Sequence, residues 1–308
     1  MQTSEAPPVP QSMDEKKKEL RTSLLFKLRP IYPFIVILAI WQVAAMQARG
    51  NQGRLFPTVD AIVYRAWELV TDPLFRALAE NPNLSFLDHI WKLLESPILL
   101  HTLNTAWRLP FSFFIAAVVG TIVGIMMGRF AFWESFFVPL LSVLLPIPAI
   151  AWTPIVVIWS GIGDQTVIVI TAFASFLPIA MAVWTGVKTV NPVWIRAAQS
   201  MNADKMTIFR TVVLPGSLPM ILSGMRIGLA RAWRAGVGAE AFAGIRWGLS
   251  AGIFDAQEYL DIAFMMVALG ILGLFGFVLE KVLFQPIESR TVIRWGMMEA
   301  MGAQDKKV

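Results

Sequence analysis

The sequence predicts an all-α integral membrane protein with six transmembrane helices, because the chain is unusually apolar for its length. Of its 308 residues, 56% are hydrophobic and 15% are charged, whereas soluble domains are about 25% charged. The mean hydropathy of +0.62 agrees with a membrane protein. A helix needs roughly 20 apolar residues to cross a bilayer, and several segments reach or approach that length. The six predicted spans are residues 31–46, 109–127, 136–160, 167–187, 218–235 and 262–284.

The first span follows a polar N-terminal segment, residues 1–29, that ends in a basic run. Lysine and arginine collect on the cytoplasmic side of membrane proteins. The segment is therefore predicted to be a cytoplasmic tail, and the first span to be an uncleaved helix rather than a signal peptide. At about 16 residues, this span is short for crossing a bilayer.

Charges between the later spans agree with this orientation. The loops after the second and fourth spans and the C-terminal tail, residues 286–308, carry basic residues, while the loops after the third and fifth spans are mainly acidic. The basic residues are Arg129, Lys188, Arg196, Lys205, Arg210, Arg290 and Arg294, and the acidic ones are Asp164, Asp255, Glu258 and Asp261. Both termini are therefore predicted to be cytoplasmic.

A long segment, residues 47–107, separates the first two spans and mixes charges of both signs. Its apolar residues, such as Ile90, Trp91 and Leu94, recur at helical spacing and predict short amphipathic helices on the outer surface. With the first span, this segment forms a predicted region at 30–107. The other five spans form a predicted core domain at 108–285.

The second span carries Gly120, Gly124 and Gly128, one glycine every fourth residue. Such a ladder of small residues lets two membrane helices approach closely. We expect these glycines to serve helix packing rather than ligand binding.

The third span contains four prolines: Pro139, Pro146, Pro148 and Pro154. Each proline lacks a backbone donor and leaves a carbonyl unpaired, which hydrocarbon tolerates only where the break faces protein or a water-filled path. Pro148 and the nearby Trp152 are therefore candidates for a solute path. The alternative is a kinked helix that only packs against its neighbours.

The loop between the fourth and fifth spans, residues 191–215, predicts two short helices. Asn191 and Pro192 make a good helix start, Asn202 interrupts the helix, and Asp204 can cap a second helix that ends before Leu214 and Pro215. Two short helices on the cytoplasmic face indicate either a docking surface or a simple interfacial hairpin.

The fifth span holds three arginines, Arg226, Arg231 and Arg234, followed by Glu240. A charge inside a membrane normally faces a cavity or a partner. Gly236 and Gly238 are expected to break the helix, so that Glu240 folds back toward the arginines. These residues then either contact an anion in a path, with Arg226 and Arg231 best placed, or form a structural ion pair.

The sequence lacks the residues that redox, metal-binding and ATP-hydrolysing sites usually require. The chain has no cysteine and only two histidines, His89 and His101, which argues against redox or metal centres. No phosphate-binding loop of the Gly-x-x-x-x-Gly-Lys-[Ser/Thr] type occurs, so the chain is not expected to hydrolyse ATP. We predict no cofactor, no metal, no nucleic-acid partner and no catalytic residue.

Three stretches resemble permeases of ABC importers. Residues 191–215 resemble the cytoplasmic EAA loop of this group: Ala197 and Ala198 match its two alanines, and Leu214 and Pro215 match its ending. Arg196 stands where these permeases have glutamate, and Asn202 where they have glycine. Residues 144–164 (LLPIPAIAWTPIVVIWSGIGD) and 224–233 (GMRIGLARAW) are similar to the third and fifth spans of the nitrate/sulfonate/taurine-type permeases.

This resemblance implies the type I ABC importer permease fold, in a bacterial inner membrane. It further implies two cytoplasmic ATPase subunits, a second permease copy as a homodimer, and a soluble or lipid-anchored substrate-binding protein, with lipid around the spans. The coupling residues implied on the loop are Arg196, Ala197, Ala198, Asn202, Ala203, Leu214 and Pro215.

The resemblance implies a small oxyanion as the substrate, of the sulfonate/taurine, nitrate or bicarbonate class. An aromatic carboxylate or a pyrimidine vitamin precursor is an alternative within the same class of importer. An ion-coupled secondary transporter is a further alternative, but it would need its own coupling carboxylates, for which Glu240 near the end of the fifth span is the candidate.

Overall fold

The computed structural model describes residues 32–48, 55–80 and 85–284. The two predicted tails, 1–29 and 286–308, lie outside the described residues. The chain divides into two units, residues 1–64 and 65–308, and each is described by itself.

The first unit contains the helix α2 (Tyr32–Gln47) and the start of α3 (Val59–Glu80). Trp41 stacks on Phe56 with ring centroids 4.2 Å apart and donates its indole N–H to the carbonyl of Pro57 at 3.0 Å. The side-chain oxygen of Gln42 accepts a hydrogen bond of 2.7 Å from the backbone N–H of Val59, the first residue of α3. The apolar helix α2 has 16 residues, as the first predicted span does, and is shorter than a full span.

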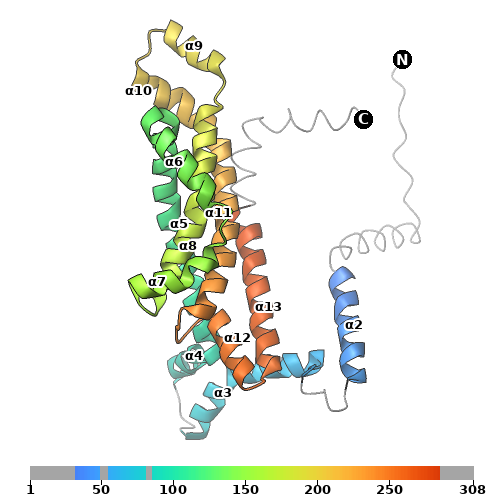
Figure 1. Cartoon of the computed structure of the whole chain (residues 1–308). Helices are drawn as coiled ribbons and strands as arrows, with labels where there is room; N and C mark the ends of the chain where they lie inside the picture. The colour runs from blue at the N-terminus through green and yellow to red at the C-terminus, as the bar shows by residue number, and fades with distance from the viewer. Residues whose placement is uncertain (1–31, 49–54, 81–84, 285–308) are drawn as a thin grey trace, which may run out of the picture. The chain divides into compact units, whose positions relative to one another are not determined.

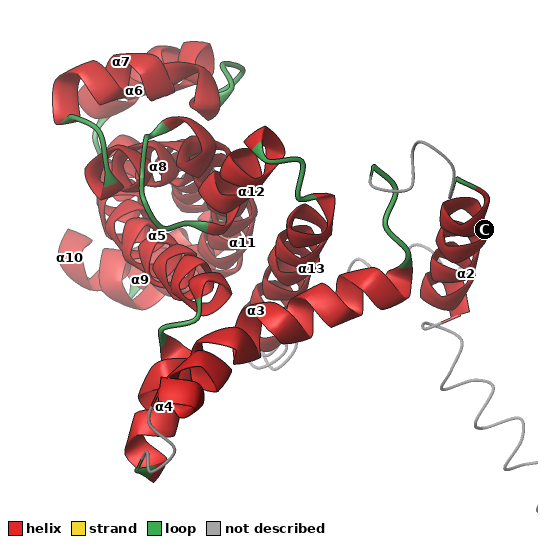
Figure 2. Cartoon of the chain, turned by 90° about the horizontal axis from the view of Figure 1, so that it is seen from below, coloured by secondary structure: helices red, strands yellow, loops and turns green. Residues whose placement is uncertain are grey.

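The second unit is built around three long helices, α5 (Pro97–Arg129), α8 (Asp164–Lys188) and α11 (Leu214–Phe242), which run side by side in both views (Figures 1 and 2). The helix α8 packs along both α5 and α11. Its apolar stretch is 61% buried, compared with 22–28% for the other long spans, so α8 is the central helix of this unit. The remaining elements are α4 (Phe86–Leu94), α6 (Ala131–Leu144), the 3-10 turn η1 (Ala149–Trp152), α7 (Thr153–Ser160), α9 (Pro192–Ser200), α10 (Lys205–Ile208), the π turn η2 (Phe209–Val213), α12 (Leu249–Glu258), α13 (Ile262–Val278) and the π turn η3 (Leu279–Phe284).

Within the second unit, α9 and α10 lie at one end, and α4 and α12 lie at the other (Figure 1). The second part of α3 belongs to this latter end. There, Arg65 bridges Glu68 at 2.7 Å and Asp261 at 2.6 Å, and Asp261 in turn caps α13. The prediction of helices between the first two spans is confirmed by α3 and α4.

Each of the six predicted spans corresponds to a helix or a helix pair, but they differ in length. Among the described residues, four helices are long and apolar enough to cross a membrane: Pro97–Arg129, Asp164–Lys188, Lys205–Phe242 and Ile262–Lys281. The predicted third span is a fifth candidate, but it is not one continuous helix. It breaks between α6 and η1, and the two parts are bent by 94°. Pro146 and Pro148 lie in the break, where neither can donate the backbone hydrogen bond that would continue α6.

The glycine ladder of α5 packs against α8, as predicted. A Cβ atom added to Gly124 would lie 2.6 Å from Cβ of Val183 and 2.7 Å from the carbonyl oxygen of Ala180. Both distances are far below van der Waals contact. The glycines at 120 and 128 meet Ile179 and Val187 in the same way. Only a residue without a side chain lets the two helices come this close.

We therefore expect Gly124→Ala to destabilise the bundle by about 1–3 kcal/mol, the usual cost of overpacking a filled interior. A matched control is Gly270→Ala in α13, where an added Cβ would meet no atom within 4 Å. This control should leave stability unchanged or raise it slightly, because alanine is the better helix former. Thermal unfolding of both variants in detergent measures the difference. Equal unfolding temperatures would show that the close approach contributes nothing.

Candidate functional site

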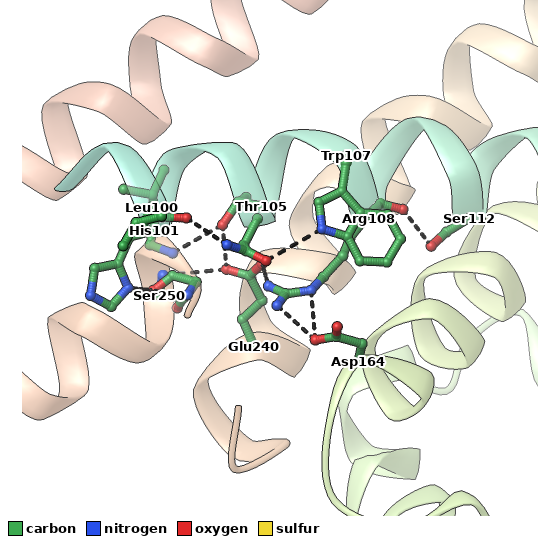
Figure 3. A network of polar contacts seen from close by, with 12 residues as sticks. Leu100, His101, Thr105, Trp107, Arg108, Ser112, Asp164, Glu240 and Ser250 are labelled. Atoms are coloured by element: carbon green, nitrogen blue, oxygen red, sulfur yellow. Dashed lines mark hydrogen bonds and ion pairs between the residues drawn. The ribbon is translucent and has the colours of Figure 1, made fainter. Parts of the chain in front are cut away.

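A cluster of charged side chains, two of them buried, joins three helices near the α12 end of the second unit (Figure 3). Arg108 of α5 donates from Nη1 to Oε1 of Glu240 on α11 at 3.0 Å. From Nη2 and Nε it donates to Oδ1 of Asp164, the first residue of α8, at 2.7 and 3.0 Å. The side chains of Arg108 and Glu240 are 4% and 1% exposed, whereas that of Asp164 is 47% exposed. The guanidinium therefore holds one fully buried carboxylate and one that reaches the surface.

Hydroxyl and backbone groups complete the cluster and tie α12 to it. Thr105 donates its hydroxyl to Oε2 of Glu240 at 2.9 Å and accepts the backbone N–H of Leu249 at 2.9 Å. Oε2 of Glu240 also accepts the backbone N–H of Ser250 at 3.4 Å, and Nδ1 of His101 lies 2.7 Å from the carbonyl oxygen of Gly248. The first N–H groups of a helix have no partner within it, and here α5 and α11 supply those partners for α12.

The structure corrects the predicted position of Glu240. We expected Gly236 and Gly238 to break the fifth span and fold Glu240 back toward the arginines of that span, but α11 continues as a helix to Phe242 and Glu240 pairs with Arg108. The two glycines serve close approach instead. A Cβ at Gly236 would lie 2.9 Å from the hydroxyl of Thr171, and one at Gly238 would lie 2.5 Å from Ile150.

Sequence reasoning missed Arg108, Asp164, Thr105 and His101 as members of one site. A usable signal was present, because His101, Thr105 and Arg108 are spaced by four and three residues and so share one face of a helix. Their partners are 56–147 residues away along the chain, which a local pattern does not reveal. Among the described residues, no three acidic, histidine or cysteine side chains come together in a way that could hold a metal ion.

A cavity of about 470 Å³ lies between the broken third span and α11. Two of the predicted path residues, Pro148 and Arg231, line it together with Arg234. No acidic side chain belongs to the described residues that line it. Arg231 is partly exposed and makes no hydrogen bond or ion pair with any residue that the structure describes.

Besides Glu240, the remaining predicted path residues are Arg226 and Trp152, and neither lines this cavity. Arg226 lines a second cavity, of about 410 Å³, between α11 and α13, where it pairs with Glu280 at 3.1 Å. Trp152 packs against the apolar core between α7, α8 and α11, with its ring 5.7 Å from that of Phe173. Its indole N–H is buried and has no partner among the described residues.

The predicted docking loop folds largely as its sequence indicates. Asn191 caps α9 by accepting the N–H of Val193 at 2.9 Å, and Asn202 ends the turn after α9 with a φ of 58°, a left-handed conformation that asparagine tolerates well. Asp204 then caps α10. Hydrogen bonds from the Thr207 hydroxyl and from the N–H groups of Thr207 and Met206 lower the pKa of the Asp204 carboxyl.

One part of that prediction is wrong. The second helix does not end before Leu214 and Pro215, because α10 continues through the π turn η2 directly into α11. Pro215 lies just after the π turn, and it has no N–H to donate to the preceding turn of the continuous helix. On α9, Arg196 and Ala197 are exposed and Ala198 is half-buried, whereas Ala203 is half-buried in the turn between α9 and α10.

Known proteins resemble this chain in sequence and in fold. Residues 116–292 match the family described as binding-protein-dependent transport system inner membrane component. The taurine transport system permease protein of Escherichia coli is 33% identical over 220 residues, covering 70% of this chain and 80% of that protein. A nitrate import permease protein of Synechocystis is 25% identical over 256 residues, covering 82% of this chain and 86% of that protein. A solved structure of a methionine ABC transporter in inward-facing conformations matches at a TM-score of 0.51 and 21% identity, over 60% of this chain and 92% of that one.

The matched residues take in the C-terminal part of α5, from residue 116, all of α6 to α13 and the loop 191–215. The likeness to the methionine transporter agrees in fold, and the described part of the chain is helical without strands. The predicted family and the predicted all-α, multi-pass membrane fold are thus confirmed. This chain belongs to the family of binding-protein-dependent transport system inner membrane components, the permeases of ABC importers.

Proposed function

We propose that the chain is the permease subunit of an ATP-driven importer for a small oxyanion, of the sulfonate, nitrate or bicarbonate class. The observation that carries this proposal is the cavity of about 470 Å³, whose described lining holds two arginines and no carboxylate. Relatives named for taurine and nitrate transport support the same class of substrate. An anion is the solute that such a cavity would favour.

The chemistry of the arginines fits this substrate. An anion that enters a low-dielectric path loses hydration and needs a cation that is not already neutralised. Arg231 meets this requirement, since no residue in the described part of the chain pairs with it. Guanidinium groups match the oxygens of sulfonate, nitrate and carboxylate with two parallel hydrogen bonds. Because a tight site would hinder release, the contact would be transient.

The partners follow from the family and from the loop. Two cytoplasmic ATPase subunits would bind the loop formed by α9 and α10. A second copy of the chain would complete the solute path. A separate binding protein would deliver the anion to the permease. Both termini and the loop would face the cytoplasm, and the core domain would extend over 108–285. Arg196 is exposed on α9, so the ATPase groove would offer it an acidic or hydrogen-bond-accepting group. Closure of the ATPases would rock the permease between two open states.

Reconstitution tests this proposal. The chain is placed in proteoliposomes with its ATPase and binding protein, and the uptake of labelled taurine, nitrate and bicarbonate is measured with and without ATP. ATP-dependent accumulation of one of these anions is the expected result. Accumulation of an aromatic carboxylate or a vitamin precursor alone would overturn the assignment of substrate, and accumulation without ATP would overturn the importer mechanism.

Arg231→Ala is expected to lower the rate of uptake about tenfold or more, the order expected for loss of a hydrogen bond between charged groups. Arg231→Lys should recover part of the rate, because it restores the charge without the two parallel donors. Affinity of the binding protein for the anion should stay unchanged. A matched control is Arg246→Ala, since Arg246 is exposed and stacks on its neighbour Trp247 at 5.4 Å. Uptake equal to wild type in Arg231→Ala, at equal membrane abundance, would rule out the anion contact.

A further inference from the structure

Two cavities lie on different sides of α11, and arginine side chains line both of them. The cavity of about 470 Å³ lies toward the broken third span and contains Arg231 and Arg234. The one of about 410 Å³ lies toward α13 and contains Arg226, Arg234 and Glu280. Among the described lining residues, Arg234 alone is common to both cavities.

The guanidinium of Arg234 is fixed by one hydrogen bond from Nε, and its two terminal nitrogens remain available as donors. Its Nε donates to the carbonyl of Ala230, one turn earlier in α11, at 3.0 Å. The two terminal nitrogens make no hydrogen bond or ion pair with the described residues. A guanidinium fixed in this way presents its terminal N–H groups without the full entropic cost of ordering a long side chain.

In both cavities, Arg234 carries a positive charge that no described carboxylate compensates. In the larger cavity, Arg231 and Arg234 face no described carboxylate. In the smaller one, Glu280 lies 3.1 Å from Arg226 and compensates one positive charge, so Arg234 supplies the positive charge that remains. The rest of the smaller cavity is largely apolar and includes Leu229, Trp233 and Leu279. It therefore suits an anion that also carries a short organic group.

We infer that Arg234 is a second substrate-contacting residue, at which an organic oxyanion passes between the two cavities. This inference rests on the proposed import of an oxyanion. The terminal nitrogens of Arg234 hold the sulfonate or carboxylate oxygens, and the apolar wall formed with α13 accepts the organic part. Arg231 and Arg234 then act in succession along the path.

The absence of cysteine from the sequence allows a direct test. Arg234→Cys is reconstituted in the full importer with cysteine-free partners and treated with a thiosulfonate reagent that attaches an aminoethyl group through a disulfide. We expect uptake by Arg234→Cys to fall about tenfold and the attached ammonium group to restore much of it. Excess substrate during turnover should slow the labelling. Treatment with a neutral methyl reagent of the same type, or with a negatively charged sulfonate reagent, should restore nothing.

Two readouts separate a substrate contact from a structural role. Hydrolysis of ATP stimulated by the binding protein, and the unfolding temperature of the complex, should stay close to wild type in Arg234→Cys. Wild-type uptake by Arg234→Cys, or equal rescue by the neutral reagent, would overturn the inference while leaving the proposed function intact. Failure of the wild-type complex to take up any oxyanion would instead overturn the proposed function.

Discussion

Arg108→Met is expected to destabilise the helix bundle by about 3–5 kcal/mol, the usual cost of removing one partner of a buried ion pair. Glu240 is 1% exposed and would be left with a charge that no cation compensates. The free energy of unfolding, followed by titration of the purified protein with a denaturing detergent, measures this loss. It is the largest effect on stability that we expect from a single substitution.

Two further variants identify the source of that loss. Arg108→Met combined with Glu240→Met removes both charges and should recover most of the stability, because a buried pair can be replaced by apolar groups at little cost. Asp164→Asn should cost less than about 1 kcal/mol, since the Asp164 side chain is 47% exposed and water can solvate it. A double variant as unstable as Arg108→Met alone would show that the ion pair is not responsible.

Ala198→Arg is expected to reduce uptake to about a tenth of wild type or less while the protein still inserts and assembles. Ala198 lies half-buried on α9, in the loop that we propose binds the ATPase. A long cationic side chain there would clash with the ATPase surface that we propose receives α9. The loss of one tight contact worth about 1.4 kcal/mol already gives a tenfold effect.

The coupling assay needs a control of the same chemistry at the other end of the second unit. Gln165→Arg fits, because Gln165 is exposed at the start of α8. It should transport at the wild-type rate. Co-purification of the ATPase with each variant reports docking directly. If Ala198→Arg retained both the ATPase and full uptake, the loop would not be the coupling surface.

Local rules predicted the parts of the fold that depend on neighbouring residues. Asn191 and Asp204 cap helices, Asn202 adopts a left-handed turn, and the glycines of α5 permit close packing, each as the sequence indicates. These features are decided within a few residues or by the size of one side chain. Proline likewise predicted a disturbed third span, but not the 94° bend.

The parts that could not be predicted depend on residues far apart in the chain. Arg108 meets a carboxylate 132 residues away, and no pattern near either residue indicates the pairing. Gly236 and Gly238, which follow Arg234, were expected to break the helix, and this prediction is wrong. Only the position of Thr171 and Ile150 against α11 decides for close approach. The role proposed for Arg234 likewise depends on cavity walls that come from distant parts of the chain.

The helices α10 and α11 are continuous through η2, so a tilt at one end of this segment moves residues at its other end. At about 1.5 Å per residue, roughly 44 Å of continuous helix separates Lys205, beside the loop, from Arg234, between the cavities. A tilt of about 5° at the loop would therefore carry the guanidinium of Arg234 by about 4 Å, comparable to the diameter of a small anion. The π turn η2 lies near the loop end of this segment, at Phe209–Val213, and π bulges are positions where helices kink. If the loop binds the ATPases as proposed, a small tilt there would therefore move the Arg234 guanidinium by about the size of one anion.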